Sequence, residues 1–244
     1  MTEDSRIRLV IVNGDSQTYG DELADRHWSV WGAVLARRLG ADFVNLAVCA
    51  ASNHRTVRVT VERLDAYATE RGLRPDEVLF LGMWSKTARF EAYTGEPDLQ
   101  GGLTDEVPEG GWARIHSAYI PRRDMRSIGW FRDIASDHGD HSEFLMYWVL
   151  LDAWLARRGY RYGFLWAFDP DPKVFEDLPQ YSDQIDFSRV LGAGTFRYGG
   201  PSIYALGAEL DDLAPNRHPS ERSQEVFVDR YLYDWVLELA GGDR

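Results

Sequence analysis

Residues 12–20 read Val-Asn-Gly-Asp-Ser-Gln-Thr-Tyr-Gly, and they close the apolar run that extends from Ile7 to Val12. An apolar run that ends in glycine and short polar residues, ahead of an amphipathic stretch, indicates a buried strand that turns into a helix. A serine at such a turn exposes its hydroxyl at the carboxyl edge of a sheet, close to backbone N–H groups. The same residues are also typical of a plain turn and helix cap. Ser16 is therefore a candidate nucleophile, and Asp15 is either its cap or a neighbour in a substrate site.

The rest of the chain alternates short apolar runs with helical patterns. The runs predict strands at Arg8–Val12, Asp42–Leu46, Val78–Gly82 and Tyr162–Ala167. Apolar residues at helical spacing predict helices across 28–39, 57–68, 144–155 and 228–239. This alternation favours an α/β fold with a central, mostly parallel sheet, in one domain over residues 1–244. Two segments, 94–129 and 169–212, are longer than ordinary connections. We expect them to be insertions that either cover the sheet edge and form the substrate pocket or make contact with a partner.

Composition narrows the classes of partner. The 244 residues carry a formal net charge of -12, which disfavours nucleic acids and anionic membranes because the chain repels phosphate. No apolar run approaches a membrane span, and Met1–Asp4 lacks the basic and apolar regions of a signal peptide. Cys49 is the single cysteine, so an intramolecular disulfide is excluded. We expect a soluble cytoplasmic protein, and the sequence does not indicate its oligomeric state.

Acyl transfer by a serine needs a base and donors for an oxyanion. His218 precedes the final amphipathic helix, where Pro219 suits the first turn, so it is the candidate base. A lone histidine at a helix start is, equally, often without chemical importance. After the second strand, residues 45–53 leave the sheet through small side chains toward a helix capped by Ser52 or Asn53. Small residues let backbone N–H groups approach a ligand.

These segments together resemble the SGNH/GDSL hydrolase family. Residues 14–16, 45–53, 81–85 and 218–220 match its four blocks in order across nearly the whole chain. The resemblance implies a three-layer α/β/α, flavodoxin-like fold and hydrolysis of an ester or related acyl compound. It implies that Ser16 attacks, that His218 is the base, and that an aspartate three residues earlier orients the histidine. In that family the oxyanion donors are the serine amide, a second-block glycine amide and a third-block asparagine side chain.

Three positions depart from the family pattern. Ala50 stands at the glycine position and keeps the backbone N–H. Trp84 stands at the asparagine position, where its indole N–H is a donor of a different shape. Pro215 stands at the aspartate position and cannot orient an imidazole. The alternatives that remain open are Ser85 or Asn53 as oxyanion donors, and Asp212, Asp211 or a backbone carbonyl behind His218.

Two further segments carry charged or ligating residues. Arg89 lies beside the sheet edge, where it either binds a substrate carboxylate or phosphate or pairs with Glu91 on one face of a strand. Residues 137–141 contain a His-x-x-His pattern, but Gly139 weakens a helix there and no distant third ligand is evident. We interpret this segment as a polar loop before a helix that starts at Glu143, capped by Asp140 or Ser142. The sequence thus predicts neither a metal nor a cofactor.

The sequence favours a serine-dependent hydrolase or acyltransferase that acts on a small ester or thioester through an acyl-enzyme. The departures at Trp84 and Pro215 motivate an alternative of another class, a binding or accessory protein that kept the fold and lost the chemistry. A Ser16–His218 contact backed by a carboxylate would favour the enzyme, whereas a site filled by Trp84 would favour the binding protein.

Overall fold

In the computed structural model, residues 6–95 and 110–241 are described. The predicted insertion at 94–129 therefore falls partly outside the described residues, as do Met1–Asp4. None of the described helices combines the length and apolar composition that crossing a membrane requires.

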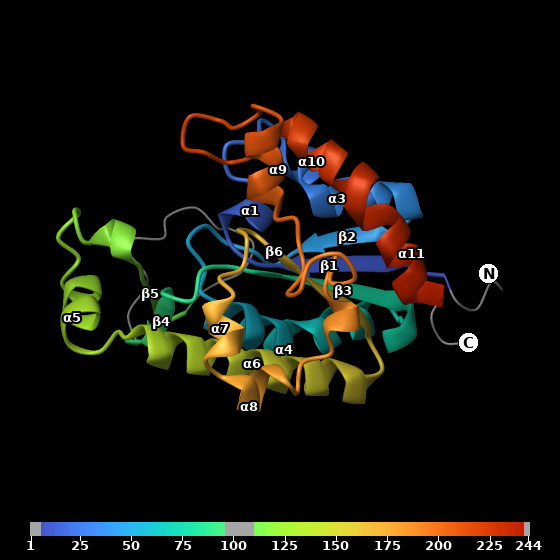
Figure 1. The fold of residues 1–244 in the computed structure, drawn as a ribbon. Coiled ribbons are helices and arrows are strands. Elements are labelled where there is room, and N and C mark those ends of the chain that lie inside the picture. The colour runs from blue at the N-terminus through green and yellow to red at the C-terminus, as the bar shows by residue number, and fades with distance from the viewer. Residues whose placement is uncertain (1–5, 96–109, 242–244) are drawn as a thin grey trace.

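Four parallel strands form the central sheet, in the order β2-β1-β3-β6 (Figure 1). They are β1 (Leu9–Asn13), β2 (Asp42–Asn45), β3 (Val78–Trp84) and β6 (Arg161–Trp166). Each confirms a predicted strand to within a residue or two. The chain runs from β1 to β2 on one side and then crosses to β3 on the other, so the connections diverge at the carboxyl end of β1. In open parallel sheets, ligands bind in the crevice at such a switch point.

Helices cover both faces of the sheet, so the predicted α/β architecture is confirmed. One face carries α4 (Asn53–Glu70) and α6 (Asp137–Arg158), which lie below the sheet in Figure 1. The other carries α3 (Trp31–Leu39), α9 (Ile203–Glu209), α10 (Glu221–Phe227) and α11 (Tyr233–Gly241), with the π-helical turn η5 (Val228–Leu232) joining α10 to α11. The strand pleat divides the core accordingly, because Leu9 and Ile11 pack toward α4 and α6 while Val10 and Val12 pack toward α3 and α10.

The remaining elements are short. They are α1 (Ser16–Tyr19), α2 (Arg26–Ser29), η2 (Pro75–Glu77), η3 (Ser117–Tyr119), α5 (Met125–Asp133), α7 (Lys173–Glu176), α8 (Pro179–Ser182) and η4 (Phe187–Arg189). An antiparallel hairpin of β4 (Phe90–Tyr93) and β5 (Trp112–Ile115) projects with α5 beyond the carboxyl end of the main sheet (Figure 1). Strand β5 and η3 lie within the first predicted insertion, whereas β4 ends just before it, and α7, α8, η4 and α9 lie within the second.

The polar loop predicted at 137–141 is wrong. These residues form the first turns of α6, whose N-cap is Ser136, and the Ser136 hydroxyl accepts a hydrogen bond from the Gly139 amide at 3.2 Å. The helix therefore starts six residues before the predicted Glu143. Tertiary packing of the long α6 stripe outweighs the low helix propensity of Gly139. Within the described residues, no three His, Cys, Asp or Glu side chains are grouped as metal ligands.

Candidate functional site

The site begins where β1 ends. Gly14 lies close to β3, since a Cβ built on it would stand 3.0 Å from the Met83 carbonyl oxygen and 2.5 Å from Thr18 Oγ1. The next residue, Asp15, caps α1 by accepting a hydrogen bond from the Gln17 amide at 3.0 Å. The cap starts a single helical turn at Ser16 and so orients the serine at the carboxyl edge of the sheet.

Ser16, His218 and Glu22 form a continuous hydrogen-bonded chain. Nε2 of His218 lies 3.0 Å from the Ser16 hydroxyl oxygen. Nδ1 of the same ring lies 2.8 Å from the Glu22 carboxylate, which requires the Nδ1–H tautomer and leaves Nε2 free to accept a proton. Ser16 is 8% exposed and the His218 side chain 15%, so the pair is sheltered but reachable from solvent.

Glu22 reaches His218 because the chain reverses immediately after α1. Gly20 ends the turn in the left-handed region at φ 82°, and its amide donates to the Ser16 carbonyl oxygen. Glu22 itself has φ 67°, which is uncommon for a residue with a Cβ and costs about 1 kcal/mol or more. Strained backbone of this kind persists where the surrounding contacts fix it, and it is frequent at functional sites.

The loop that carries His218 is fixed from both sides. An antiparallel bridge joins Leu213 to Pro219, and the Ala214 amide donates to the His218 carbonyl oxygen at 2.8 Å. Asn216 then donates to the Glu22 carboxylate through its backbone amide at 3.0 Å and its side chain at 3.1 Å. Glu22 therefore holds both the imidazole and the loop that presents it.

The hydrogen bonds also determine the charge state of Glu22. Partial desolvation acts to raise its pKa, but hydrogen bonds from Asn216 and His218 outweigh this effect and hold the pKa below its usual value. The carboxylate is consequently anionic at neutral pH. A second carboxylate, that of Asp21, lies 3.7 Å from His218 Nε2 on the solvent side, with its side chain 42% exposed.

The structure corrects the predicted partner of His218. Asp212 caps α10, because its carboxylate accepts hydrogen bonds from the Ser220 hydroxyl at 2.5 Å and from the Ser223 amide at 2.8 Å. Burial acts to raise the Asp212 pKa, but these hydrogen bonds lower it overall. Asp211 is exposed and left-handed at φ 50°. The Asp212 carboxylate is thus occupied at the N-terminus of α10, and the carboxylate that contacts His218 Nδ1 is that of Glu22.

Two backbone amides border the serine. Among the described residues, the amides of Ser16 and Ala50 donate to no protein acceptor, and both residues line the same cavity. Ala50 takes the left-handed conformation at φ 60°, as a glycine there would do readily and an alanine does at a cost. Arg114 from β5 donates to the carbonyl oxygen of Cys49 and so fixes this segment.

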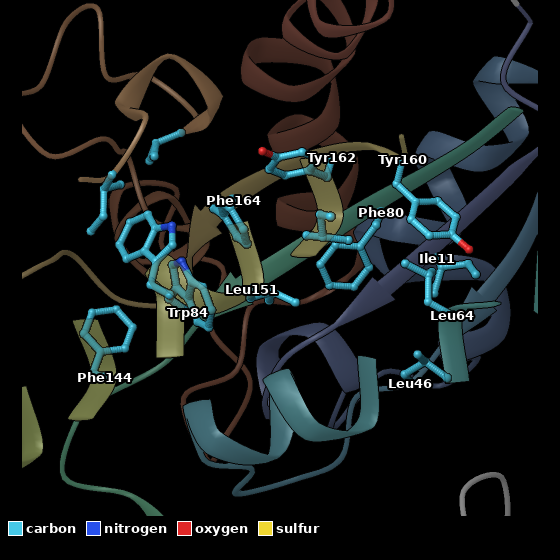
Figure 2. Packing of buried hydrophobic residues seen from close by; sticks show 14 of the residues in the cluster. Ile11, Leu46, Leu64, Phe80, Trp84, Phe144, Leu151, Tyr160, Tyr162 and Phe164 are labelled. Atoms are coloured by element: carbon cyan, nitrogen blue, oxygen red, sulfur yellow. The ribbon is translucent and has the colours of Figure 1, made fainter. Parts of the chain in front are cut away.

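The three side chains considered as oxyanion donors lie elsewhere. Trp84 is fully buried, because β3 extends to this residue and the pleat directs it inward. Figure 2 shows it packed with Phe144 and Phe164, at ring-centroid distances of 5.4 Å and 5.1 Å. Asn53 and Ser85 satisfy each other, since the Ser85 amide donates to Asn53 Oδ1 at 2.8 Å and Asn53 Nδ2 donates to the Ser85 carbonyl at 3.1 Å.

Asp15 is part of a buried polar cluster behind the serine. Its carboxylate accepts hydrogen bonds from the Ser85 hydroxyl and from Arg89, each at 2.6 Å. Arg89 therefore pairs with Asp15 and not with Glu91, which instead binds Arg58 at 2.7 Å. Asp15 positions the turn that carries Ser16 through these contacts, while Arg89 also lines the cavity.

A cavity of about 1070 Å³ opens in front of the Ser16–His218 pair. Tyr119 from the first insertion and Tyr204 from the second line it, whereas Phe175, Phe187 and Tyr198 pack into the core instead. A neighbouring cavity of about 300 Å³ is more apolar and shares Lys86 and Phe168 with the first. The insertions therefore build part of the cavity wall, while Phe175, Phe187 and Tyr198 contribute to the core.

Cys49 also lines the larger cavity. Burial, and then the nearby Asp21 carboxylate, raise the pKa of its thiol to about 12. The thiol is therefore protonated at neutral pH and is a poor nucleophile.

Sequence reasoning missed Glu22, Arg114 and His116 as residues of the site. Glu22 had one local signal, because Gly20 after a short helix indicates a left-handed reversal of the chain. Arg114 and His116 lie on and just after β5, which no pattern connects to the serine turn. Only the position of the hairpin across the sheet edge brings them to the cavity.

A family model described as a family of unknown function, DUF6071, matches residues 12–244. The chain belongs to this family. No curated protein matched the sequence.

Solved structures of several esterases are similar in overall course. They include the psychrotrophic esterase EstA from Pseudoalteromonas sp., with 9% identity, 96% of this chain and 97% of that chain covered, and a TM-score of 0.48. A member of the lipolytic protein G-D-S-L family from Veillonella parvula has 13% identity, 95% and 97% coverage and a TM-score of 0.47. An acetyl xylan esterase from the rumen bacterium Butyrivibrio proteoclasticus has 11% identity, 98% and 65% coverage and a TM-score of 0.46. At these values the likeness says nothing about individual residues, so the chemistry follows from the site itself.

Proposed function

We propose that this protein is a serine-dependent hydrolase of esters or thioesters, with Ser16 as nucleophile, His218 as base and Glu22 as the carboxylate that orients the base. The observation that carries the proposal is the chain of contacts from the Ser16 hydroxyl through the imidazole to Glu22, at 3.0 Å and 2.8 Å. A nucleophile, a base and an orienting carboxylate within hydrogen-bond reach are the arrangement that activates a serine.

In the proposed reaction, the Ser16 oxygen bonds to the acyl carbon while its proton passes to His218 Nε2. Glu22 stabilises the imidazolium that forms, and the amides of Ser16 and Ala50 donate to the oxyanion. His218 then returns the proton to the departing alcohol or thiol, which leaves an acyl group on Ser16. Water repeats the sequence and releases the acid. If an alcohol takes the place of water, the same intermediate gives acyl transfer.

The alternative of a binding protein that lost its chemistry has less support. Its two motivating features were Trp84 and Pro215 at family positions. Trp84 lies in the core and does not fill the site, and Glu22 supplies the carboxylate that Pro215 cannot. The geometry therefore favours an enzyme over an accessory protein.

A fluorophosphonate serine probe tests the proposal. We expect the wild-type protein to be labelled. The Ser16→Ala variant should lose labelling because it lacks the hydroxyl, and His218→Ala should lose it because an unactivated serine hydroxyl reacts slowly. Ser188→Ala and His138→Ala, both exposed and away from the cavity, are the matched controls and should label normally. Turnover of an aryl acetate by all five proteins provides an independent readout. Labelling or turnover that persists in folded Ser16→Ala protein would contradict the assignment.

A further inference from the structure

The cavity in front of Ser16 is cationic although the protein is acidic. Six cationic side chains line it, against the single carboxylate of Asp21: Arg26, Lys86, Arg89, Arg114, Arg122 and Arg217. The whole chain carries 39 acidic and 27 basic residues, a net charge of -12. Such a local reversal of sign, in a concave site, raises the concentration of anions there and repels cations.

Several of these cations are engaged by the protein, and others are not. Arg89 pairs with Asp15 at 2.6 Å, and Arg114 donates to the Cys49 carbonyl. By contrast, Lys86, Arg122 and Arg217 pair with no carboxylate in the described part of the chain. They come from three separate segments, namely the loop after β3, the turn after η3 and the loop before His218. These three cations converge on the cavity without a structural ion pair to explain them.

Aromatic rings support two of the three. The Lys86 ammonium lies 5.1 Å from the centre of the Phe168 ring, and the Arg122 guanidinium lies 5.7 Å from that of Tyr119. Cation–π contacts of this kind hold a charged group in place without neutralising it. Both rings also line the cavity. The two cations are thus held at its wall with their charge available to a ligand.

His116 adds an uncharged donor to the same wall. Its Nδ1 accepts a hydrogen bond from the Ala118 amide at 2.9 Å, so in the neutral ring Nε2 carries the proton. Burial, and then the positive charges of Arg89 and Lys86, lower its pKa to about 4. The ring is therefore neutral at physiological pH, mainly because it is buried and secondarily because Arg89 and Lys86 are positive.

We propose that the ester cleaved at Ser16 is an anion, whose non-reacting part carries phosphate or carboxylate groups bound by Lys86, Arg122 and Arg217. That the ligand is an ester rests on the proposed function, whereas its negative charge is inferred from the cavity alone. Guanidinium and ammonium groups recognise both kinds of oxyanion, so the chemistry they share is a negatively charged oxygen cluster. Uncharged esters lack these contacts and should be poorer substrates.

Three aryl acetates with the same scissile bond test the inference: uncharged methyl 3-acetoxybenzoate, 3-acetoxybenzoate and 3-acetoxyphenyl phosphate. We expect kcat/KM for at least one anionic ester to exceed that for the uncharged ester about tenfold, a modest factor because the three cations are solvent-exposed. The preference should shrink as ionic strength rises. A preference for the phosphate identifies a phosphorylated substrate, and one for the benzoate a carboxylated substrate.

The variant Lys86→Gln/Arg122→Gln/Arg217→Gln should bring this ratio close to one. Lys173→Gln/Arg126→Gln/Arg197→Gln removes the same charges outside the cavity and should keep the ratio. Equal anionic-to-uncharged kcat/KM ratios in the two variants, or no preference in the wild-type protein, would overturn the anionic-substrate inference. In that case, Ser16-dependent turnover of the uncharged ester would still support the proposed function.

Calorimetry of pyrophosphate binding to Ser16→Ala protein tests the cavity without any turnover. We expect binding that weakens about tenfold in the triple cavity variant but not in the control. If the Ser16→Ala variant keeps the hydrolytic activity and pyrophosphate still binds as expected, the proposed function fails and the anion site stands. Absence of pyrophosphate binding overturns the anion site, whatever the outcome for ester hydrolysis.

Discussion

Glu22 and His218 are 196 positions apart in the chain, yet their side chains lie 2.8 Å apart. An imidazole that takes a proton from serine becomes positive, and a carboxylate behind it stabilises that state and fixes the tautomer. Glu22 also accepts a hydrogen bond from the Asn216 amide, so one side chain orients the His218 imidazole and anchors the loop that carries it. At the scale of the residue, a substitution of Glu22 is therefore the most direct test of the proposed mechanism.

Replacing Glu22 with glutamine should lower kcat/KM by about 10²–10⁴-fold, because the amide cannot stabilise the imidazolium. Glu22→Asp should recover part of the loss. Glu225→Gln, on the exposed side of α10, is the control and should behave as wild type. Labelling rates and thermal unfolding are measured together so that a folding defect is recognised. Undiminished activity in Glu22→Gln would show that Glu22 does not assist His218.

Asp212 stabilises the start of α10, and an amide substitution also tests this role. Asp212→Asn should reduce the free energy of unfolding by about 1–3 kcal/mol, since the amide replaces a carboxylate that accepts from Ser220 and Ser223. Asp211→Asn, exposed and left-handed, should change it by less than about 0.5 kcal/mol. Denaturant unfolding provides both values. A catalytic loss in Asp212→Asn without a loss of stability would return Asp212 to the role of His218 partner.

At the scale of the element, the turn from β1 into α1 depends on its close approach to β3. Gly14→Ala would place a Cβ against the Met83 carbonyl oxygen, which belongs to a central strand and cannot move freely. We expect a loss of about 1–3 kcal/mol in stability and slower labelling of Ser16, because the turn must shift. Gly129→Ala in α5 meets nothing within 4 Å and should be neutral or slightly stabilising. Normal labelling and stability in Gly14→Ala would show that the turn tolerates the added carbon.

The pleat of β3 determines which of its side chains pack against the helices on each face of the sheet. Phe80 and Trp84 share one face of β3 and pack toward α4 and α6, while Leu79, Leu81 and Met83 face α3 and α10. The sequence pattern predicts that this strand ends at Gly82, which would place Trp84 in a loop at the site, but β3 extends to Trp84. Two additional strand residues were enough to direct the indole into the core, because side chains alternate along a strand.

At the scale of the whole molecule, the neutral His116 couples stability to pH. Its pKa is near 6.5 in the unfolded chain and about 4 in the fold, so between these values the unfolded state binds the extra proton. Stability should therefore fall as pH drops from 6.5 to 4, by roughly 3 kcal/mol at most from this group. Burial lowers the pKa of His54 too, and that histidine adds to the same decline.

The variant His116→Gln isolates the contribution of His116, since glutamine does not titrate in this window. Its free energy of unfolding, measured by denaturant at intervals from pH 7 to pH 4, should decline less steeply than that of the wild-type protein. His54→Gln is the matched comparison and should remove a separate part of the slope. Parallel curves for His116→Gln and wild type would mean that His116 titrates normally in the fold.

The sequence by itself determined the strands of the main sheet, the main helices that cover it and the two residues of the proposed nucleophile pair. Periodicity and turn residues are local properties, and parallel strands bring their carboxyl ends to one edge whatever the details. This is why local sequence patterns alone indicate Ser16 and His218 as candidates. It is also why Ser52 was among the expected caps of α4, and its hydroxyl does accept from the Arg55 amide.

Only the tertiary structure decided Glu22 as the partner of His218, Trp84 as a core residue and the cationic lining of the cavity. Each depends on segments far apart in the chain, and the local reversal at Gly20 does not show which distant residue Glu22 reaches. Two left-handed residues, Glu22 and Ala50, bend the backbone toward the serine at a local cost that the surrounding contacts offset. The acidic composition does not reveal the basic cavity either, because net charge is a sum over the whole chain and does not show which charges lie together in the fold.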